Sequence, residues 1–420
     1  MTLSEDLRWR GLIKDKTFQD DSWLDTPRTF YLGADAGSAD SLTIGNLAIF
    51  LVARRLAQAG WRPVLLMGGA TSLIGDPGGK DEERDLKGAE EVEANIQGIQ
   101  TQVSSLFEGR EFTLVNNYEW FKDIGVLEFL RDVGKHFSMT ELVGRDYIQA
   151  RMGEGGSGIS YAEFSYSLIQ GYDYYHLYKH HDVTLQIGGS DQWGNMLSGA
   201  PLIRKKEALE GREAEVHAFS MPLVINKTTG KKFGKSEGGA VWLDQSRTSP
   251  TQFYQFWINC DDEGVEDYLK IYTMLSKQEI EAVIAEHRLQ PRERIAQSRL
   301  ALEVTQLVHG TEAAENAQAV TGLLTGIVAI GEADDAVLDI FRSEQPSYTA
   351  AVGDSILTAL TETGLATSST EARRLLKDNA ISINGAKVMR EAFQATDFAS
   401  GRLLLRKGKK FKDTALIESA

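Results

Sequence analysis

The sequence predicts an α/β protein whose first half folds around a parallel sheet with helices on both faces. In the first 220 residues short apolar runs alternate with stretches of helical periodicity, which is typical of strand–helix–strand units. A buried apolar run at residues 62–67 ends in a Gly-Gly pair, and another at residues 29–32 leads through small residues into a helix. We expect strands at residues 29–32, 62–67, 113–116 and 184–187, and helices at residues 46–58, 90–107, 161–176 and 192–205.

The remaining segments predict an insertion and two further units. Residues 117–158 are mostly helical in pattern and interrupt the alternation, while residues 252–309 place Leu, Ile and Val at three- and four-residue spacing. After Gly353 two short helices (356–363 and 369–378), a strand into an Asn-Gly turn and a strand at 402–406 predict a small α+β unit. The predicted domains are residues 1–220 (α/β, with the insertion at 117–158), 221–248 (a lysine-containing loop region), 249–325 (α-helical), 326–350 (linker) and 351–420 (α+β).

Composition restricts the class of protein. The 420 residues are 42% hydrophobic and 25% charged, and no apolar run approaches the ~18 residues of a membrane-spanning helix. The N-terminus lacks the pattern of a signal peptide, and Cys260 is the only cysteine, which excludes an internal disulfide; a cytoplasmic protein is expected. A net charge of −15 argues against nonspecific coating of nucleic acid, yet residues 351–412 carry eleven Lys and Arg against six Asp and Glu. This local excess of +5 predicts a basic face on the last unit.

The most informative stretch runs from Tyr31 to Leu47. A strand-like start passes through small residues into a helix that begins near Ile44. In an α/β sheet this is the place where phosphate meets a helix N-terminus. A second candidate for phosphate binding is the loop at residues 231–239, in which Lys232 and Lys235 stand three residues apart beside glycines. Taken alone, this loop is equally compatible with a solvated lysine turn.

Three more stretches carry polar side chains that suit a small substrate. Tyr166, Gln170 and Asp173 share one helix face and could hold an ammonium group and a phenol hydroxyl, although spacing alone favours a polar surface stripe. Asp191 follows a strand that ends in Gly-Gly, where a carboxylate can accept ribose hydroxyls. Asp76 ends a glycine-rich turn and can bind an ammonium group.

Together these stretches resemble the bacterial-type tyrosyl-tRNA synthetases, which are class I aminoacyl-tRNA synthetases. Residues 43–46 are similar to the HIGH signature with Thr43 and Asn46 at the two histidine positions, and residues 232–236 resemble the KMSKS loop in its KFGKS form. Residues 166–173 and 186–195 resemble the tyrosine- and ribose-contacting segments, and residues 364–376 with 383–385 resemble a ribosomal-protein-like RNA-binding domain. The resemblance runs from about Trp9 to Lys412 and implies a Rossmann-like catalytic domain, an α-helical anticodon-side domain and a C-terminal RNA-binding domain.

The resemblance also implies the activity and its residues. The chain would activate tyrosine with ATP, accompanied by Mg²⁺ and without a protein-bound metal, and transfer the tyrosyl group to tRNA(Tyr). The implied catalytic residues are Lys80, Arg84, Lys232, Lys235, Thr43 and Asn46. The implied tyrosine-binding residues are Tyr31, Asp76, Tyr166, Gln170, Asp173 and Gln192. The implied ATP-binding residues are Gly33, Asp35, Ser38, Gly45, Gly189, Asp191 and Lys235, and the implied RNA-binding residues are Arg373, Arg374, Lys407, Lys409 and Lys410. A homodimer with the insertion at its interface is also implied.

The departure from the family lies at Thr43. Threonine is shorter than the family's histidine and uncharged, though its hydroxyl can donate one hydrogen bond. The loop before it is one residue longer than in relatives, with Ala36-Gly37-Ser38 in place of Pro-Thr, and Ser38 offers a hydroxyl of its own. Two alternatives remain: a catalytically weakened paralogue that acts as an RNA-binding protein, and an enzyme that passes activated tyrosine to a non-tRNA acceptor.

Overall fold

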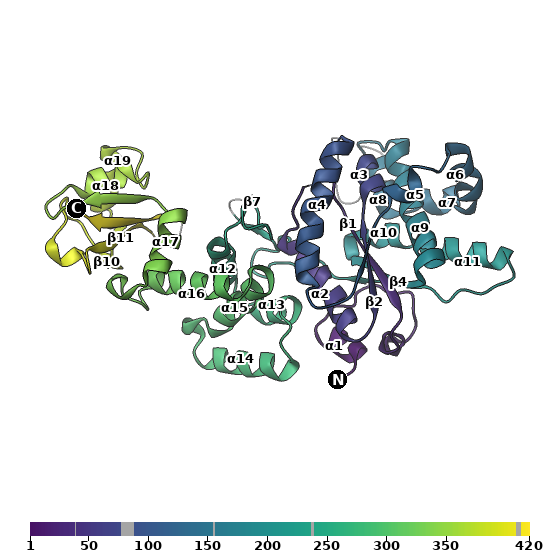
Figure 1. The fold of residues 1–420 in the computed structure, drawn as a ribbon, viewed down its shortest axis with the longest axis horizontal. Helices are drawn as coiled ribbons and strands as arrows, with labels where there is room; N and C mark the ends of the chain where they lie inside the picture. Colours follow the sequence, from purple (N-terminus) through teal and green to yellow (C-terminus); the bar gives the residue numbers. More distant parts are fainter. Residues whose placement is uncertain (38, 77–87, 154–155, 237–238, 409–412) are drawn as a thin grey trace. The chain divides into compact units, whose positions relative to one another are not determined.

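The computed structural model describes residues 1–420 apart from residues 38, 77–87, 154–155, 237–238 and 409–412 (Figure 1). The chain forms two compact units, each described here by itself. The first consists of Met1–Arg247 with Asp261–Ala285, and the second of Thr248–Cys260 with Glu286–Ala420. Within the described residues no helix is long and apolar enough to cross a membrane.

A five-stranded parallel sheet forms the centre of the first unit and confirms the predicted α/β class. Its order is β3 (Thr113–Asn116), β2 (Arg62–Met67), β1 (Thr29–Ala34), β4 (Val183–Gly189) and β5 (His217–Met221). The chain adds β2 and β3 on one side of β1 and then β4 and β5 on the other side. The order therefore reverses between β1 and β4, and ligands in such sheets bind at the carboxyl ends of the two strands beside that point.

Helices follow these strands much as predicted. The predicted helices correspond to α2 (Ile44–Gln58), α4 (Ala89–Leu106) and α9 (Tyr161–His181), which runs further than expected before it ends at Asp182 in a left-handed conformation. Helix α9 begins at a capping box, in which Ser160 and Glu163 each accept a hydrogen bond from the other's backbone N–H. The helix expected at residues 192–205 is instead a 3-10 turn, α10 (Trp193–Met196) and α11 (Gly199–Leu209). Gly199 lies against Tyr174 so closely that a Cβ would come within 2.6 Å of the ring, which fixes the start of α11.

The insertion is helical, as expected. It contains α5 (Tyr118–Phe121), α6 (Val126–Asp132), α7 (Met139–Val143) and α8 (Asp146–Met152). Leu142 and Ile148 pack against Phe164 of α9 in a small apolar cluster. Beside it the buried Arg151 and Glu163 form a bidentate ion pair, with 2.5 Å between Nη1 and Oε1, which ties α8 to α9.

After β5 the chain stays in the first unit to Arg247, and it re-enters this unit at Asp261. The strands β6 (Lys235–Ser236) and β7 (Gly239–Ala240) form a short antiparallel pair. Helix α13 (Val265–Tyr272) then belongs to the first unit, where Arg10 and Arg55 donate to backbone carbonyls at its C-terminal end. Cationic side chains are favourable at a helix C-terminus, because the last carbonyls lack partners in the helix.

The second unit joins helices to a second sheet. Its helices include α12 (Pro250–Ile258), α15 (Ile295–His309), α16 (Thr311–Thr325), α17 (Asp335–Glu344), α18 (Ile356–Glu362) and α19 (Ser369–Lys377). The sheet order is β10 (Ala386–Lys387), β9 (Ile381–Ile383), β11 (Arg402–Lys407), β12 (Thr414–Ser419) and β8 (Ser347–Ala350). Asn384 and Gly385 have φ of 47° and 84° in the predicted turn. The strands that the sequence did not predict include β5 in the first unit and β10, β12 and β8 here. Strand β12 follows the lysine-rich cluster, and β8 pairs with it from within the segment taken as a linker.

Candidate active site

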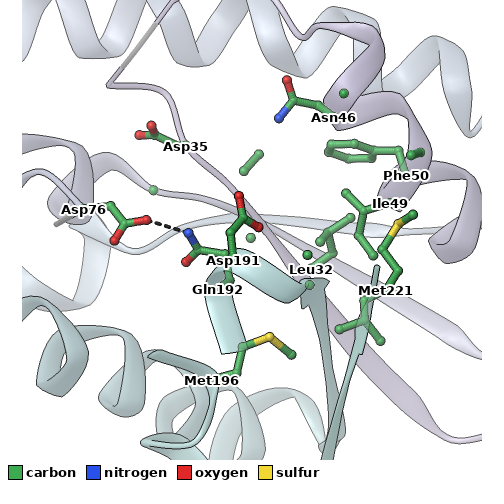
Figure 2. A pocket seen from close by; sticks show the side chains of 18 of the residues that line it. Leu32, Asp35, Asn46, Ile49, Phe50, Asp76, Asp191, Gln192, Met196 and Met221 are labelled. Carbon is green, nitrogen blue, oxygen red and sulfur yellow. Dashed lines mark hydrogen bonds between the residues drawn. The ribbon is translucent and has the colours of Figure 1, made fainter. Parts of the chain in front are cut away.

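A cavity of about 280 Å³ lies at the carboxyl ends of β1 and β4, where the strand order reverses (Figure 2). It brings together most of the described residues that the sequence singled out. These are Tyr31, Gly33, Asp35, Thr43, Gly45, Asn46, Asp76, Tyr166, Gln170, Asp173, Gly189, Asp191, Gln192 and Lys232. Ser38, Lys80, Arg84, Lys409 and Lys410 lie outside the described residues, as does the side chain of Lys235.

Asp173 and Tyr31 form a buried polar corner of this cavity. The two Asp173 oxygens accept hydrogen bonds from Asn117 Nδ2 at 3.1 Å and from Trp120 Nε1 at 3.0 Å. Burial raises the pKa of Asp173 to about 8, although these two N–H donors oppose the effect. The Tyr31 hydroxyl is buried and has no hydrogen-bond partner among the described residues. A buried polar group without a partner is costly, so this corner suits a ligand hydroxyl.

Asn117 and Trp120 contact the candidate site directly, and the sequence did not single them out. Both come from the start of the insertion, Asn117 directly after β3 and Trp120 within α5. The one available signal was the position of Asn117 at the carboxyl end of a predicted strand, where polar side chains commonly face a ligand. By holding both oxygens of Asp173, the two side chains fix the carboxylate in one orientation.

A second carboxylate, Asp76, is fixed at the other side of the cavity. Gln192 Nε2 donates to one of its oxygens at 2.6 Å, as Figure 2 shows, and Asn195 Nδ2 donates to the other at 3.2 Å. Ser167 in turn donates to Asn195 Oδ1 at 3.1 Å. A fixed carboxylate at the cavity wall can receive an ammonium group. Asn195 and Ser167 support the site but were assigned no role from the sequence.

The Thr43 hydroxyl bonds to the neighbouring Asn46. Thr43 precedes α2 in an extended conformation, and its Oγ1 donates to Asn46 Oδ1 at 2.8 Å. The Thr43 backbone N–H donates to the same Asn46 oxygen at 3.0 Å. Because these bonds occupy the amide oxygen, the amide nitrogen is the group that Asn46 presents on the cavity side (Figure 2). Two hydrogen bonds thus join Thr43 and Asn46, the first and last residues of the stretch that the sequence singled out.

The lysine-containing loop begins as a hairpin anchored on α13. Phe233 N–H donates to the Val224 carbonyl at 2.8 Å, and the buried Phe233 ring stacks on Tyr268 with 4.2 Å between ring centroids. Gly234 follows with φ of 108°, and a Cβ there would lie 3.2 Å from Ile44 Cγ1. A side chain at this position would therefore be strained and crowded. The glycine allows the loop to lie directly against the start of α2.

Backbone hydrogen bonds join the same two loops. Ile44 N–H donates to the Val241 carbonyl at 3.1 Å, and Leu243 N–H donates to the Leu42 carbonyl at 2.8 Å. The Lys232 ammonium lies 3.4 Å from an Asp191 carboxylate oxygen at the cavity wall. Both side chains are exposed, and exposed ion pairs contribute only about 0–1 kcal/mol. Lys232 can accordingly exchange this carboxylate for a phosphate at little cost.

Comparisons with known proteins agree with this geometry. Residues 25–324 match the family described as class I tRNA synthetases (W and Y), and residues 337–412 match a tyrosine–tRNA ligase C-terminal domain. The chain belongs to the tyrosine–tRNA ligases. It is 43% identical over 425 residues to the tyrosine–tRNA ligase of Bacillus caldotenax and 40% identical over 423 residues to tyrosine–tRNA ligase 2 of Bacillus anthracis. Each alignment covers 98% of this chain and 98% of the relative.

A solved structure supports the same family. The C-terminally truncated mitochondrial tyrosyl-tRNA synthetase of Aspergillus nidulans is similar to this chain with a TM-score of 0.67 and 31% identity. That likeness covers 75% of this chain and 92% of the other chain. The predicted family, fold class and ligase activity are thereby confirmed.

The candidate RNA-binding residues lie in the second unit of this tyrosine–tRNA ligase. Arg373 and Arg374 are exposed on α19, and Lys407 ends β11. Arg373 Nε lies 3.0 Å from Glu391, and Lys407 Nζ lies 3.8 Å from Glu371. Two of these three cations therefore have carboxylate partners on the same surface. Groups of acidic side chains or histidines that could hold a metal ion are absent from the part of the chain that is described.

Proposed function

We propose that the cavity between β1 and β4 is where this ligase joins tyrosine to ATP and then passes the tyrosyl group to tRNA. The observation that carries the proposal is the buried corner made by Asp173 and Tyr31, whose hydroxyl lacks a partner among the described residues. A phenol hydroxyl bound there would donate to the carboxylate and accept from Tyr31. A site built in this way rejects phenylalanine because its own polar groups would be left unpaired, an effect for which tyrosine-specific ligases are the usual example.

The remaining polar side chains orient the reacting carboxylate. Asp76, held by Gln192, receives the ammonium group of the amino acid, with Tyr166 and Gln170 beside it at the cavity wall. The substrate carboxylate is already ionised at neutral pH, so no general base is needed. One of its oxygens attacks the α-phosphorus of ATP, a P–O bond forms, and the bond to the β-phosphate oxygen breaks to release pyrophosphate. Catalysis then depends on positioning and on stabilising the phosphate charge.

The phosphates would lie between the two loops that meet at the start of α2. Lys232 and Lys235 would supply positive charge, as would Lys80 and Arg84, which lie outside the described residues, and the first N–H groups of α2 would add donors. Asp35 and Asp191 face the nucleoside, beside Gly33, Gly45 and Gly189, where small residues let the backbone approach. Mg²⁺ that accompanies ATP would supply further positive charge to the phosphates.

Two partners complete the proposal. The tRNA would contact the second unit through Arg373, Arg374 and Lys407, since Arg and Lys side chains provide most phosphate contacts. A second copy of this chain would cover α6, whose Val126 and Leu127 are 70% and 80% exposed. Adjacent apolar side chains exposed to this degree are typical of an interface. Sedimentation velocity tests the dimer, because a single species of 46.4 kDa would contradict it.

Tyrosine-dependent exchange of pyrophosphate into ATP is the test of the activation step. The wild-type protein is expected to catalyse exchange with tyrosine and not with phenylalanine. Asp173→Asn should lose most of this activity, while Asp123→Asn, at an exposed position of the insertion, should not. Exchange no faster than in the absence of tyrosine would refute the proposal. Binding of tRNA without exchange would instead favour the RNA-binding alternative.

A further inference from the structure

The loop that precedes Thr43 lies against one face of helix α4. Asn95, Gly98 and Gln102 are spaced three and four residues apart, so they point to the same side of the helix. The described loop residues on that side are Ala36 and residues 39–42, which connect β1 to the start of α2. This is the loop that the resemblance in the sequence implies to be one residue longer than in relatives. We call the three helix residues the α4 clamp.

Each member of the α4 clamp contacts the backbone of the loop. Asn95 is only 6% exposed, and its Nδ2 donates to the Ala36 carbonyl at 2.8 Å. At the far end of the loop, the Leu42 N–H donates to Gln102 Oε1 at 2.8 Å. Two polar side chains thus hold the loop at both ends by hydrogen bonds to its main chain.

Between these bonds the loop comes closest to α4 at Gly98. A Cβ on Gly98 would lie 2.3 Å from the Asp40 carbonyl oxygen and 3.2 Å from the carbonyl carbon. The atoms in the way belong to the backbone, so they cannot turn aside as a flexible side chain could. A glycine inside a helix costs roughly 0.5–1 kcal/mol relative to alanine. The close approach of the loop is a specific reason for glycine at this position.

The α4 clamp reaches the reaction site by way of the loop. None of its three residues is among the described residues that line the cavity. Leu42, which Gln102 holds, is followed by Thr43, and its carbonyl accepts from Leu243 in the segment after the lysine-containing loop. A displacement of the loop at Asp40 would therefore reach Thr43 and both nucleotide-binding loops.

We propose that the α4 clamp is a positioning element that fixes this loop so that Thr43 and Asn46 meet the ATP phosphates correctly. The inference rests on the proposed function, since it assigns ATP to this loop. In the proposed function tyrosine binds around Asp173, whose hydrogen-bond partners Asn117 and Trp120 do not belong to this loop. The α4 clamp should accordingly affect ATP and leave tyrosine binding unchanged. General packing of α4 against the sheet would change both together.

The decisive substitution is Gly98→Ala, with Thr101→Ala as its control. Both changes introduce the best helix former into the same helix, but Thr101 is exposed and, among the described residues, its hydroxyl donates to the Gln97 carbonyl of its own helix. Because a misplacement of about 1 Å costs on the order of 10²-fold in rate, Gly98→Ala should lower kcat/KM for ATP at least about tenfold. The dissociation constant for tyrosine should stay within about twofold, and Thr101→Ala should match the wild type in both.

Asn95→Asp provides a second test that keeps the size of the side chain. A carboxylate cannot donate to the Ala36 carbonyl, so the same selective loss of ATP kinetics should follow. An equal loss of tyrosine and ATP binding in these variants would overturn the proposal, as would unchanged ATP kinetics in both.

Amide hydrogen exchange gives a readout that needs no activity. Both variants should exchange faster than Thr101→Ala at Leu42 and Ile44, whose N–H groups bond to Gln102 and to the Val241 carbonyl. Unchanged protection at these two amides would overturn the inference even in an active enzyme. If the wild type failed to catalyse exchange of pyrophosphate, the proposed function would fall, and the amide protection would still decide whether the α4 clamp holds the loop.

Discussion

Replacing Thr43 by valine should slow tyrosine activation through ATP alone. Valine keeps the shape of the side chain and removes the hydroxyl that donates to Asn46 Oδ1 at 2.8 Å. The Thr43 backbone N–H still holds the same oxygen, so the Asn46 side chain is loosened and not released. The variant thus isolates one hydrogen bond at the altered signature.

The expected size follows from that bond. A net contribution of about 0.5–1.5 kcal/mol is usual for a neutral hydrogen bond. Thr43 is partly exposed, so we take about 1 kcal/mol, which corresponds to roughly a fivefold loss in rate. We therefore expect kcat/KM for ATP to fall about fivefold if orientation of the Asn46 amide matters in the transition state.

Pyrophosphate exchange at varied ATP concentration measures this effect. Thr43→Ser retains the hydroxyl and should stay within about twofold of the wild type, while tyrosine KM should be the same in all three proteins. The reasoning would be refuted if valine changed kcat/KM for ATP by less than twofold, or if serine were as damaging as valine.

Three further predictions concern the walls of the cavity. Tyr31→Phe removes a buried hydroxyl without a partner among the described residues, so urea unfolding should show a free energy of unfolding raised by about 1 kcal/mol. Titration calorimetry should show weaker binding of tyrosine to the same variant. Burial raises the pKa of Asp173 to about 8, so tyrosine affinity should rise from pH 6 to pH 8 as the carboxylate forms. The free energy of unfolding should fall between about pH 4 and pH 8, because there the aspartate is ionised in the unfolded chain and not in the folded one. Asp173→Asn should abolish both pH dependences, and a flat wild-type profile would contradict the assignment. Phe233→Ala removes the stack on Tyr268, so it should destabilise the fold by ~3 kcal/mol and raise KM for ATP. An unchanged KM would show that other contacts position the loop.

The sequence predicted those parts of the site that depend on local spacing. Gln170 and Asp173 were placed on one helix face because helical geometry relates residues three and four apart. Asn117 and Trp120 hold the same Asp173 from another element, 56 and 53 residues away along the chain, and no local pattern relates such positions. The resemblance carried over residue roles in the cavity and nothing about the side chains that orient them.

The same limit explains the role of Gly98 and the strands that were missed. A glycine inside a helical pattern looks like a weak helix position, and only the tertiary contact with Asp40 explains it. Strand β8 was taken as a linker because Gln345-Pro346 suggests a turn, yet its four residues gain a parallel partner in β12 near the C-terminus. The strand pairing depends on a segment far along the chain, since Tyr348 lies opposite Ile417.

The way the two units share the chain has a consequence for synthesis. Neither unit is a continuous segment, because Thr248–Cys260 belongs to the second unit while Asp261–Ala285 returns to the first. During translation β5, the last strand of the parallel sheet, leaves the ribosome before α13 does, so the first unit is still incomplete at that point. It must wait for α13, on which Phe233 is anchored, and therefore for a stretch that already belongs to the other unit. Domains generally fold as units as the chain emerges, so the loops around Thr43 and Lys232 should be among the last parts of the first unit to acquire their native structure.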